Sequence, residues 1–317
     1  MKVRYADIDL STGQVRDYHL SEDIVRLYLG GKGLAAYILY QELAPGIDPL
    51  SPDNILIFNT TPLTGTGAPC TSRFNATTKN VLTGGIASSN CGGSFGIKLR
   101  RAGYDGLIIR GKAPQPCSLM VIDGQITIQD ARELWGLDTE QTQHRFDRKY
   151  GCVVIGPAGE NQVRYACAVS GERVLGRCGI GAVMGSKNLK AVVTYGTRSL
   201  PINDPETFRR DVQHWVKALH KNPTTGEFLP RYGTAFWMNI VNRHHILPTL
   251  NSQQVKHDQA QRISGEYMTE HHLTRNSGCV SCPIRCERRI MLDGKEIKGP
   301  EYETLGLLGA NLGVTDI

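Results

Sequence analysis

Long apolar segments and blocks of one charge are both absent from this 317-residue sequence. No stretch approaches the ~20 apolar residues of a membrane-spanning helix, so we expect no membrane association. The net charge of +6 is small and no run of Lys or Arg dominates, which disfavours nucleic-acid binding. The chain begins with the alternation of a strand and not with a signal peptide, so we expect a cytoplasmic protein.

The signatures of nucleotide-binding loops and of disulfide frameworks are also missing. Neither G-x-G-x-x-G followed by an acidic residue nor a Walker lysine loop occurs in its proper context. The nine cysteines are an odd number in a chain without an export signal, so paired disulfides are not expected. We expect six scattered cysteines to be small buried or half-buried hydrophobic residues: Cys70, Cys91, Cys117, Cys152, Cys167 and Cys178.

What is present is an ordinary globular composition with an excess of glycine. Hydrophobic residues make up 40% of the chain and charged residues 21%, and the length allows two domains. The 35 glycines follow no Gly-X-Y period. They therefore predict tight turns and a backbone that closely approaches a bound group.

The chain changes character near residue 204. Residues 1–204 show β-rich patterning with strands predicted at 3–10, 55–59, 107–110, 119–122, 152–155 and 191–195, and helices at 23–28 and 33–42. Asp204 and Pro205 form a helix start, as N-cap and first helical residue. We predict that residues 205–317 are an incomplete, mainly helical domain with further helices at 235–242, 266–270 and 301–312. In its first helix, four residues at helical spacing are predicted core contacts: Phe208, Val212, Trp215 and Leu219.

Two segments of the first domain resemble copies of one unit. Each is a glycine-rich segment followed by a helix and a β-branched strand that ends in glycine: Ser89–Gly111 and Arg173–Gly196. Asn90 and Val174 lie at nearly equal distances before the closing glycines. The repetition predicts an α+β fold, in which a pseudo-twofold, two-sheet β-rich domain precedes the helical one and its two glycine-rich segments face each other.

The segment Gly278–Cys286 carries the clearest chemical motif. Cys279, Cys282 and Cys286 have C-x2-C-x3-C spacing. A 4Fe–4S cluster often takes three thiolates from one loop and a fourth ligand from elsewhere. Nearby arginines would favour thiolates and offset the negative charge of a cluster: Arg275, Arg285, Arg288 and Arg289.

The same cysteine motif is compatible with a zinc site. Zinc could bind these cysteines together with His271 or His272, although structural zinc loops more often pair two C-x2-C elements. The radical-SAM loop has the reverse order, C-x3-C-x2-C. A chance trio of core cysteines fits poorly beside so many arginines. The motif therefore favours an iron–sulfur cluster.

The glycine-rich segments are candidates for phosphate binding. Backbone N–H groups without a side chain in the way can bind phosphate. The guanidinium group of Arg73, which follows the segment 61–69, can bind the same anion. Asn90 could offer a side-chain oxygen to a divalent cation. Tight turns in a β domain would account for the same glycines equally well.

The segment Gly299–Leu305 is predicted to begin a helix. Glu301 in its first turn would favour the helix dipole, which is a structural role. Glu303 would face another side, and a carboxylate in an apolar pocket could act as a general base. Glu303 is therefore the candidate catalytic residue.

Taken together, these motifs resemble the tungsten-containing aldehyde ferredoxin oxidoreductase family along the whole chain. The matching segments are Gly30–Gly33, Pro62–Gly65, Ala102–Asp105, Gly156–Asn161, Gly181–Lys190, Gly278–Cys286 and Gly299–Glu303. The resemblance implies an amino-terminal pair of β-sheets that serves as the base for two tungstopterin (or molybdopterin) molecules, with a magnesium ion between their phosphates.

The resemblance also implies roles for individual residues. Asn90, by its side chain, and Val174, by its backbone carbonyl, match the magnesium ligands. Arg73 matches a residue between pterin and cluster, and Glu303 an acidic residue near the metal. The phosphate-contacting loops are matched by Gly92, Arg173 and Gly176, and the ligands of a 4Fe–4S cluster by Cys279, Cys282 and Cys286.

The implied reaction is the oxidation of an aldehyde to a carboxylic acid, with electrons passing through the cluster to ferredoxin or another iron–sulfur carrier. Family members are roughly twice as long, and the fourth cluster cysteine, an Asp-rich pterin motif and a catalytic histidine belong to the part that this chain lacks. We therefore expect the chain to be inactive alone, as a fragment, split-gene product or truncated copy that needs a second chain. A non-catalytic subunit and a small electron-transfer or zinc module remain alternatives.

Overall fold

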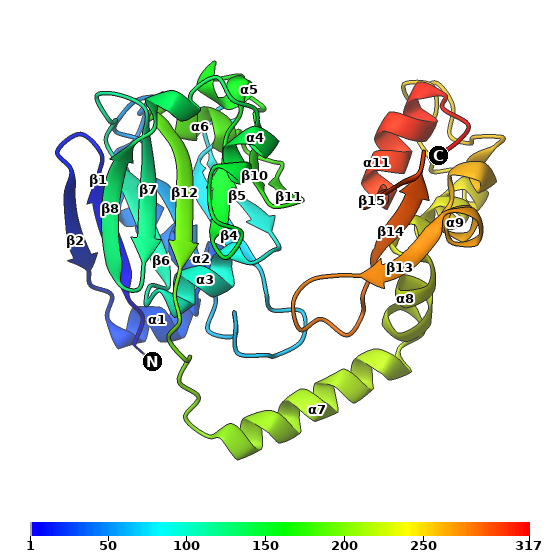
Figure 1. The fold of residues 1–317 in the computed structure, drawn as a ribbon, viewed down its shortest axis with the longest axis horizontal. Coiled ribbons are helices and arrows are strands. Elements are labelled where there is room, and N and C mark those ends of the chain that lie inside the picture. Colours follow the sequence, from blue (N-terminus) through cyan, green and yellow to red (C-terminus); the bar gives the residue numbers. More distant parts are fainter. Residues whose placement is uncertain (1) are drawn as a thin grey trace. The chain divides into compact units, whose positions relative to one another are not determined.

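The computed structural model describes residues 2–317 and divides into two compact units, Met1–Asn203 and Asp204–Ile317. Unit 1 contains two six-stranded mixed sheets, and unit 2 contains short helices around a small sheet (Figure 1). The α+β fold predicted from the sequence is confirmed. None of the helices in residues 2–317 is both long and apolar enough to cross a bilayer.

Sheet 1 has the strand order β2-β1-β6-β3-β4-β5. The only parallel pair among its described strands is β1 with β6. Its strands are β1 (Tyr5–Asp9), β2 (Gln14–Tyr18), β3 (Leu56–Asn59), β4 (Phe74–Lys79), β5 (Ile86–Cys91) and β6 (Gly106–Arg110).

Sheet 2 repeats this topology six strands later, with the order β8-β7-β12-β9-β10-β11 and β7 parallel to β12. The predicted pseudo-twofold repeat is therefore present, with β5 and β11 as corresponding edge strands. Its strands are β7 (Cys117–Ile122), β8 (Gln125–Asp130), β9 (Gly151–Val154), β10 (Ala168–Ser170), β11 (Arg173–Leu175) and β12 (Leu189–Tyr195).

One hydrophobic core joins the two sheets. Leu56 and Phe58 of β3 belong to it, while Ile57 between them packs in a separate cluster with α2. This alternation buries both faces of the strand. The core also contains apolar residues of α3 and α6, which are corresponding helices of the repeat. The helices of unit 1 are α1 (Glu22–Tyr28), α2 (Gly31–Glu42), α3 (Phe95–Arg101), a 3-10 turn (Arg132–Leu134), α4 (Thr139–His144), α5 (Pro157–Glu160) and α6 (Ile180–Ser186).

Unit 2 begins with the long helix α7 (Pro205–Lys221), whose N-cap Asp204 accepts a hydrogen bond from the Thr207 N–H at 3.0 Å. The predicted cap is confirmed. The predicted core role of the apolar stripe on α7 is wrong, because no residue of this helix is buried and Trp215 is 39% exposed. Helical spacing identifies an apolar face but not what covers it.

The rest of unit 2 packs around a core that includes Met238, Met268 and Ile290. Its three-stranded sheet, β13-β14-β15, was not predicted, and the predicted helix at 301–312 is divided into three short turns. The elements are a π-helix (Thr224–Phe228), α8 (Leu229–Tyr232), a 3-10 turn (Thr234–Phe236), α9 (Trp237–Arg243), a 3-10 turn (Ala260–Ile263), α10 (Gly265–His271), β13 (Leu273–Ser277), β14 (Glu287–Leu292), β15 (Lys295–Lys298), α11 (Tyr302–Thr304), a π-helix (Leu305–Gly309) and a 3-10 turn (Ala310–Leu312).

Candidate functional site

The three clustered cysteines lie in one hairpin loop of unit 2. Strands β13 and β14 are antiparallel, and the pair Ser277 and Glu287 closes the loop 278–286. A Cβ atom on Gly278 would lie 3.0 Å from Cα of Arg285, so the two limbs approach closely where they leave the sheet. The C-x2-C-x3-C motif is therefore held at the tip of a defined hairpin.

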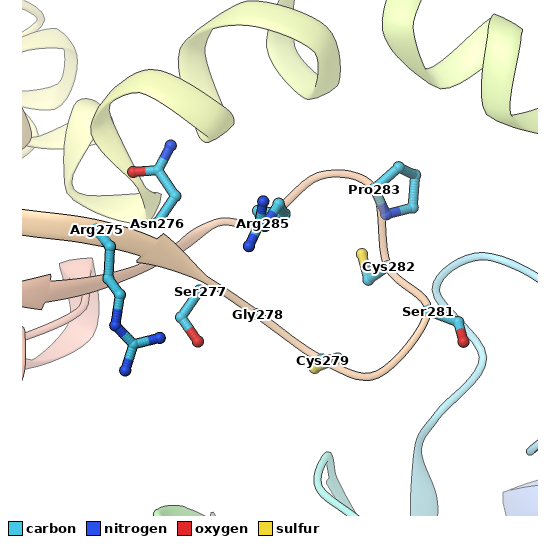
Figure 2. Close-up of a pocket in the computed structure, with 9 residues that line it drawn as sticks. All are labelled: Arg275, Asn276, Ser277, Gly278, Cys279, Ser281, Cys282, Pro283 and Arg285. Carbon is cyan, nitrogen blue, oxygen red and sulfur yellow. The ribbon is translucent and has the colours of Figure 1, made fainter.

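A pocket of about 390 Å³ lies within this loop and is lined by Cys279, Cys282, Arg275 and Arg285 among others (Figure 2). The Cys282 N–H donates to the Cys279 carbonyl at 3.1 Å, so the first two cysteines bracket one tight turn. Cys286, at the other limb, does not line the pocket. All nine cysteines of the described chain are thiols, without a disulfide.

The hairpin brings the three thiols onto one loop without arranging them as a finished metal site. In residues 2–317 no group of three or more His, Cys, Asp or Glu side chains has the geometry of a metal site. His271, a candidate zinc ligand, instead stacks on Tyr267 with ring centroids 4.0 Å apart, and its Nδ1 lies 3.0 Å from the Tyr267 carbonyl. The donor set itself, three thiols on one loop of which two line an open pocket beside arginines, fits an iron–sulfur cluster.

The two glycine-rich segments of unit 1 face each other, as predicted. Strands β5 and β11 lie against each other, and the Arg177 N–H donates to Ser89 Oγ at 3.3 Å. A Cβ atom on Gly93 would lie 3.7 Å from the Ser170 carbonyl and 3.9 Å from Arg173 Cγ. The pseudo-twofold repeat thus brings together residues that are 88 positions apart in the chain.

Arg73, just before β4, and Asn90, on β5, form one hydrogen-bonded group. The Arg73 Nε–H donates to Asn90 Oδ1, and Asn90 Nδ2 donates to the Phe74 carbonyl at 3.3 Å and to Asn75 Oδ1 at 3.1 Å. Both Arg73 and Asn90 are exposed. Their polar atoms are therefore accessible at the edge of sheet 1.

The corresponding edge strand of sheet 2, β11, is also partly exposed to solvent. Val174 on β11 is 47% exposed, and a Cβ atom on Gly176 would meet only Val174 Cγ1 at 3.6 Å. Arg173 is half-buried at the start of the same strand, whereas Gly92, which corresponds to Gly176 in the repeat, is buried. The structure brings the predicted residues of the two segments into one region of unit 1.

Glu303 lies in α11 and is exposed. Glu301 is the N-cap of this helix, not a first-turn residue, and its Oε1 pairs with Lys298 Nζ at 3.3 Å. Burial, with the charge of Glu303, raises the pKa of the neighbouring Tyr302. The apolar pocket that would favour a general base is not formed around Glu303 by the described residues.

Arg288, named in the sequence only as one of several nearby arginines, has a specific position at the base of the cysteine loop. Its side chain is 2% exposed, and its guanidinium donates to carbonyls of α8 and of the loop. Burial lowers the pKa of Arg288, while the charges of Cys286 and Glu287 oppose the shift. Cys286 lies just before β14 and Arg288 lies within it, and this close spacing of a thiol and an arginine was the signal in the sequence.

The scattered cysteines follow the prediction only in part. Cys91 and Cys117 are buried and Cys152 and Cys178 half-buried, but Cys70 and Cys167 are exposed. Burial raises the pKa of Cys117 and of Cys152 to about 12, so these two thiols stay protonated. The prediction is wrong for the two exposed residues because loop position, which spacing does not reveal, determines their exposure.

Comparison with known proteins covers both units. Residues 5–196 match the family model described as aldehyde ferredoxin oxidoreductase, N-terminal domain, and residues 211–317 match that for its domains 2 and 3. The chain is 42% identical over 322 residues to a tungsten-containing aldehyde ferredoxin oxidoreductase of Pyrococcus furiosus, with 99% of this chain and 53% of the relative covered. It is 41% identical over 321 residues to the protein of the same description from Thermococcus kodakarensis, again with 99% and 53% covered.

More distant relatives have other described activities. An aliphatic sulfonate oxidoreductase, WOR-like subunit, of Pyrococcus furiosus is 31% identical over 336 residues, covering 97% of this chain and 53% of that protein. The solved active-site complex BamBC of benzoyl-coenzyme A reductase, with 1,5-dienoyl-CoA, superposes with a TM-score of 0.81 at 28% identity, covering 98% of this chain and 50% of that one.

The chain spans about half the length of these relatives. The family models match nearly all of both units, and the named relatives of highest identity share one description. The chain therefore belongs to the aldehyde ferredoxin oxidoreductase family.

Proposed function

We propose that this chain is the cofactor-base and cluster-loop portion of a cytoplasmic tungsten (or molybdenum) bis-pterin oxidoreductase that converts aldehydes to carboxylic acids. The observation that carries the proposal is the hairpin loop with three thiols and flanking arginines. Identity of 42% to enzymes described as acting on aldehydes, against 31% and 28% to relatives with other descriptions, favours an aldehyde substrate.

In this proposal, Cys279, Cys282 and Cys286 bind a 4Fe–4S cluster. Thiolates are the usual ligands of such clusters, and positive charge nearby favours the thiolate form. The fourth ligand comes from a part of the protein outside these 317 residues, either the continuation of the chain or a second chain. The electron acceptor is ferredoxin or another iron–sulfur carrier.

The pair of glycine-rich segments binds the phosphates of two pterin molecules. Gly92, Arg173 and Gly176 provide backbone N–H groups and one guanidinium, and the absence of side chains at the glycines lets an anion approach the backbone. The exposure of Gly176 and Val174 and the contact between β5 and β11 support this assignment. When bound, the cofactor supplies the two-electron oxidation, and the protein positions it.

Asn90 and Val174 bind the magnesium ion between the phosphates, the former by its side-chain oxygen and the latter by its backbone carbonyl. Asn90 Oδ1 accepts a hydrogen bond from Arg73 in this structure. Because a cation at Oδ1 would repel the guanidinium, Arg73 would not keep this hydrogen bond in a loaded site, and its guanidinium would be available to the cofactor.

Glu303 is proposed as the catalytic carboxylate. Its exposure in α11 leaves it accessible to a substrate, and a general base needs only hydrogen-bond reach of the proton that it removes. Its apolar surroundings would come from residues beyond the 317 of this chain.

The test is anaerobic expression with tungstate or molybdate, alone and together with the carboxyl-terminal half of a relative. We expect iron and a brown colour that are lost in Cys279→Ser/Cys282→Ser/Cys286→Ser, but kept in the matched control Cys167→Ser, which changes an exposed cysteine outside the loop. Aldehyde oxidation with a viologen acceptor should require the second half. A colourless, iron-free protein in both preparations, or equal iron in the triple variant, would contradict the proposal.

A further inference from the structure

We infer that Arg288 is a positioning residue that anchors the cysteine loop and supplies the buried positive charge that balances the cluster. The inference rests on the proposed cluster site and adds a residue outside the ligand set. It is carried by the contacts of the guanidinium, by its burial and by the lack of a carboxylate among its described hydrogen-bond partners.

The guanidinium of Arg288 joins the loop to the end of α8. Nη1 donates to the Pro230 carbonyl at 2.7 Å and to the Arg231 carbonyl at 3.0 Å. Nη2 donates to the Leu229 carbonyl at 3.4 Å and to the carbonyl of Arg285, the residue before Cys286. The Leu229 carbonyl also accepts the Gly233 N–H at 3.0 Å. The later carbonyls at the end of a helix have no partners within the helix, so those of Pro230 and Arg231 are available to the planar guanidinium.

The other limb of the hairpin is attached to the same carbonyl. Asn276 Nδ2, on β13, donates to the Pro230 carbonyl at 2.8 Å. The two limbs on either side of the thiols therefore share one acceptor. Gly233, which follows α8 with φ of 68°, allows close contact here, since a Cβ atom would lie 2.9 Å from the Cys286 carbonyl and 3.2 Å from Arg288 Cγ.

Within the described part of the chain, the charge of Arg288 has no hydrogen-bonded carboxylate. Every hydrogen-bond acceptor of its guanidinium in residues 2–317 is a main-chain carbonyl, and its Nε–H is buried without an acceptor. A buried charge is costly unless a counter-charge lies near it. Cys286 lies two residues before Arg288, and its charge and that of Glu287 already favour the charged guanidinium. An anionic cluster on the thiolates would add to this counter-charge.

Three variants separate the anchoring role from the charge. Arg288→Gln removes both, Asn276→Ala removes one anchor and keeps the charge, and Arg288→Lys keeps the charge without the planar fork. Arg262→Gln is the matched control, an exposed arginine of the same unit that pairs with Asp316. Two measurements are made on the full chain: hydrogen exchange of residues 278–286 without iron, and the reduction potential and EPR spectrum after reconstitution with iron and sulfide.

We expect Arg288→Gln to speed exchange of the loop about tenfold, to weaken iron retention against a chelator about tenfold, and to shift the potential to more negative values. Asn276→Ala should speed exchange without shifting the potential, and Arg288→Lys should leave the potential near that of the wild type. Arg262→Gln should change neither quantity.

The outcomes distinguish this inference from the proposed function. A wild-type chain that takes up no iron refutes the cluster site, and the exchange data still decide the anchoring role. Loop exchange in Arg288→Gln equal to the wild type overturns the anchor. An unchanged potential in Arg288→Gln overturns the charge role. If Arg288→Gln unfolds unit 2, Arg288→Lys decides both the anchoring role and the charge role. Loop exchange in Arg288→Lys as slow as in the wild type would overturn the anchor, and an altered reduction potential would overturn the charge role.

Discussion

At the scale of single residues, Lys187 shows how one side chain joins distant parts of unit 1. It is fully buried after α6, and its ammonium group donates to the carbonyls of Pro52, Asn54 and Gly111. These acceptors belong to segments that precede and follow strands of sheet 1. Three donors meet three acceptors, which offsets the cost of burying the charge.

The first prediction is that Lys187→Met lowers the free energy of unfolding by about 3 kcal/mol, because three buried carbonyls lose their donor. Urea denaturation followed by circular dichroism at pH 7.5 measures it. An unchanged midpoint would show that the carbonyls are satisfied by other means.

The lowered pKa of Lys187 predicts that the free energy of unfolding depends on pH. Burial lowers the pKa of Lys187 from 10.5 to about 8, against the opposing charges of Asp53 and Asp9. Between these two values the unfolded chain holds a proton that the folded chain releases, so stability from this group rises with pH. The difference in unfolding free energy between the wild type and Lys187→Met should therefore grow from pH 8 to 10.5. A difference that shrinks over this window would contradict the assignment.

A second residue-scale prediction concerns Gly185 in α6. A Cβ atom there would overlap the Gly159 carbonyl oxygen of α5, which is backbone and cannot move aside. We expect Gly185→Ala to cost about 3 kcal/mol through overpacking, measured by urea denaturation. Gly85→Ala, where the nearest atom is 3.8 Å away, is the control and should stay close to the wild type.

At the scale of elements, α7 and the cysteine hairpin illustrate different sources of order. Helix α7 has a capped start and no buried residue, so its order depends on local interactions. The hairpin loop is fixed by contacts of Arg288 and Asn276 with α8, which lies 46 positions before Asn276 in the chain. Changes at the cap should therefore stay local.

We predict that Asp204→Ala speeds hydrogen exchange in the first turn of α7 about fivefold, because the Thr207 N–H loses its acceptor. Hydrogen bonds from Thr207 lower the pKa of Asp204, so the cap should persist at neutral pH and be lost as the pH falls through that lowered value. Exchange that rises throughout unit 2 instead would show that α7 is coupled to the core.

At the scale of the whole molecule, the two sheets share one topology, so their edge strands β5 and β11 present corresponding residues. The symmetry is one of backbone, not of side chains, since Asn90 corresponds to Val174. A binding group that also has approximate twofold symmetry, such as two phosphates about one cation, suits such a platform.

The final prediction compares these two positions. Asn90→Ala should reduce the magnesium and tungsten retained after desalting roughly tenfold, because a side-chain ligand is lost. Val174→Ala should retain both, since a backbone carbonyl does not depend on the side chain. Elemental analysis of protein coexpressed with the carboxyl-terminal half measures this, and equal losses in both variants would refute the assignment.

Features that depend on neighbours along the chain were predictable from the residues alone. Strands β1, β3, β6, β7, β9 and β12, the Asp204 cap and the thiol trio follow from alternation, capping chemistry or spacing, which act over a few residues. The other six strands of the two sheets, including the edge strands β5 and β11, were not predicted. The internal repeat was also readable, because both copies preserve the order of glycine segment, helix and strand.

Contacts between residues far apart in the chain could not be predicted and became known from the folded structure. The sheet β13-β15, although made of neighbouring hairpins, and the exposure of the α7 stripe were not predicted. The contacts of Lys187 with Pro52 and of Arg288 with Pro230 join residues 135 and 58 positions apart. Local patterns do not specify such partners, because the free energy of a buried contact belongs to the packed pair and not to either segment alone.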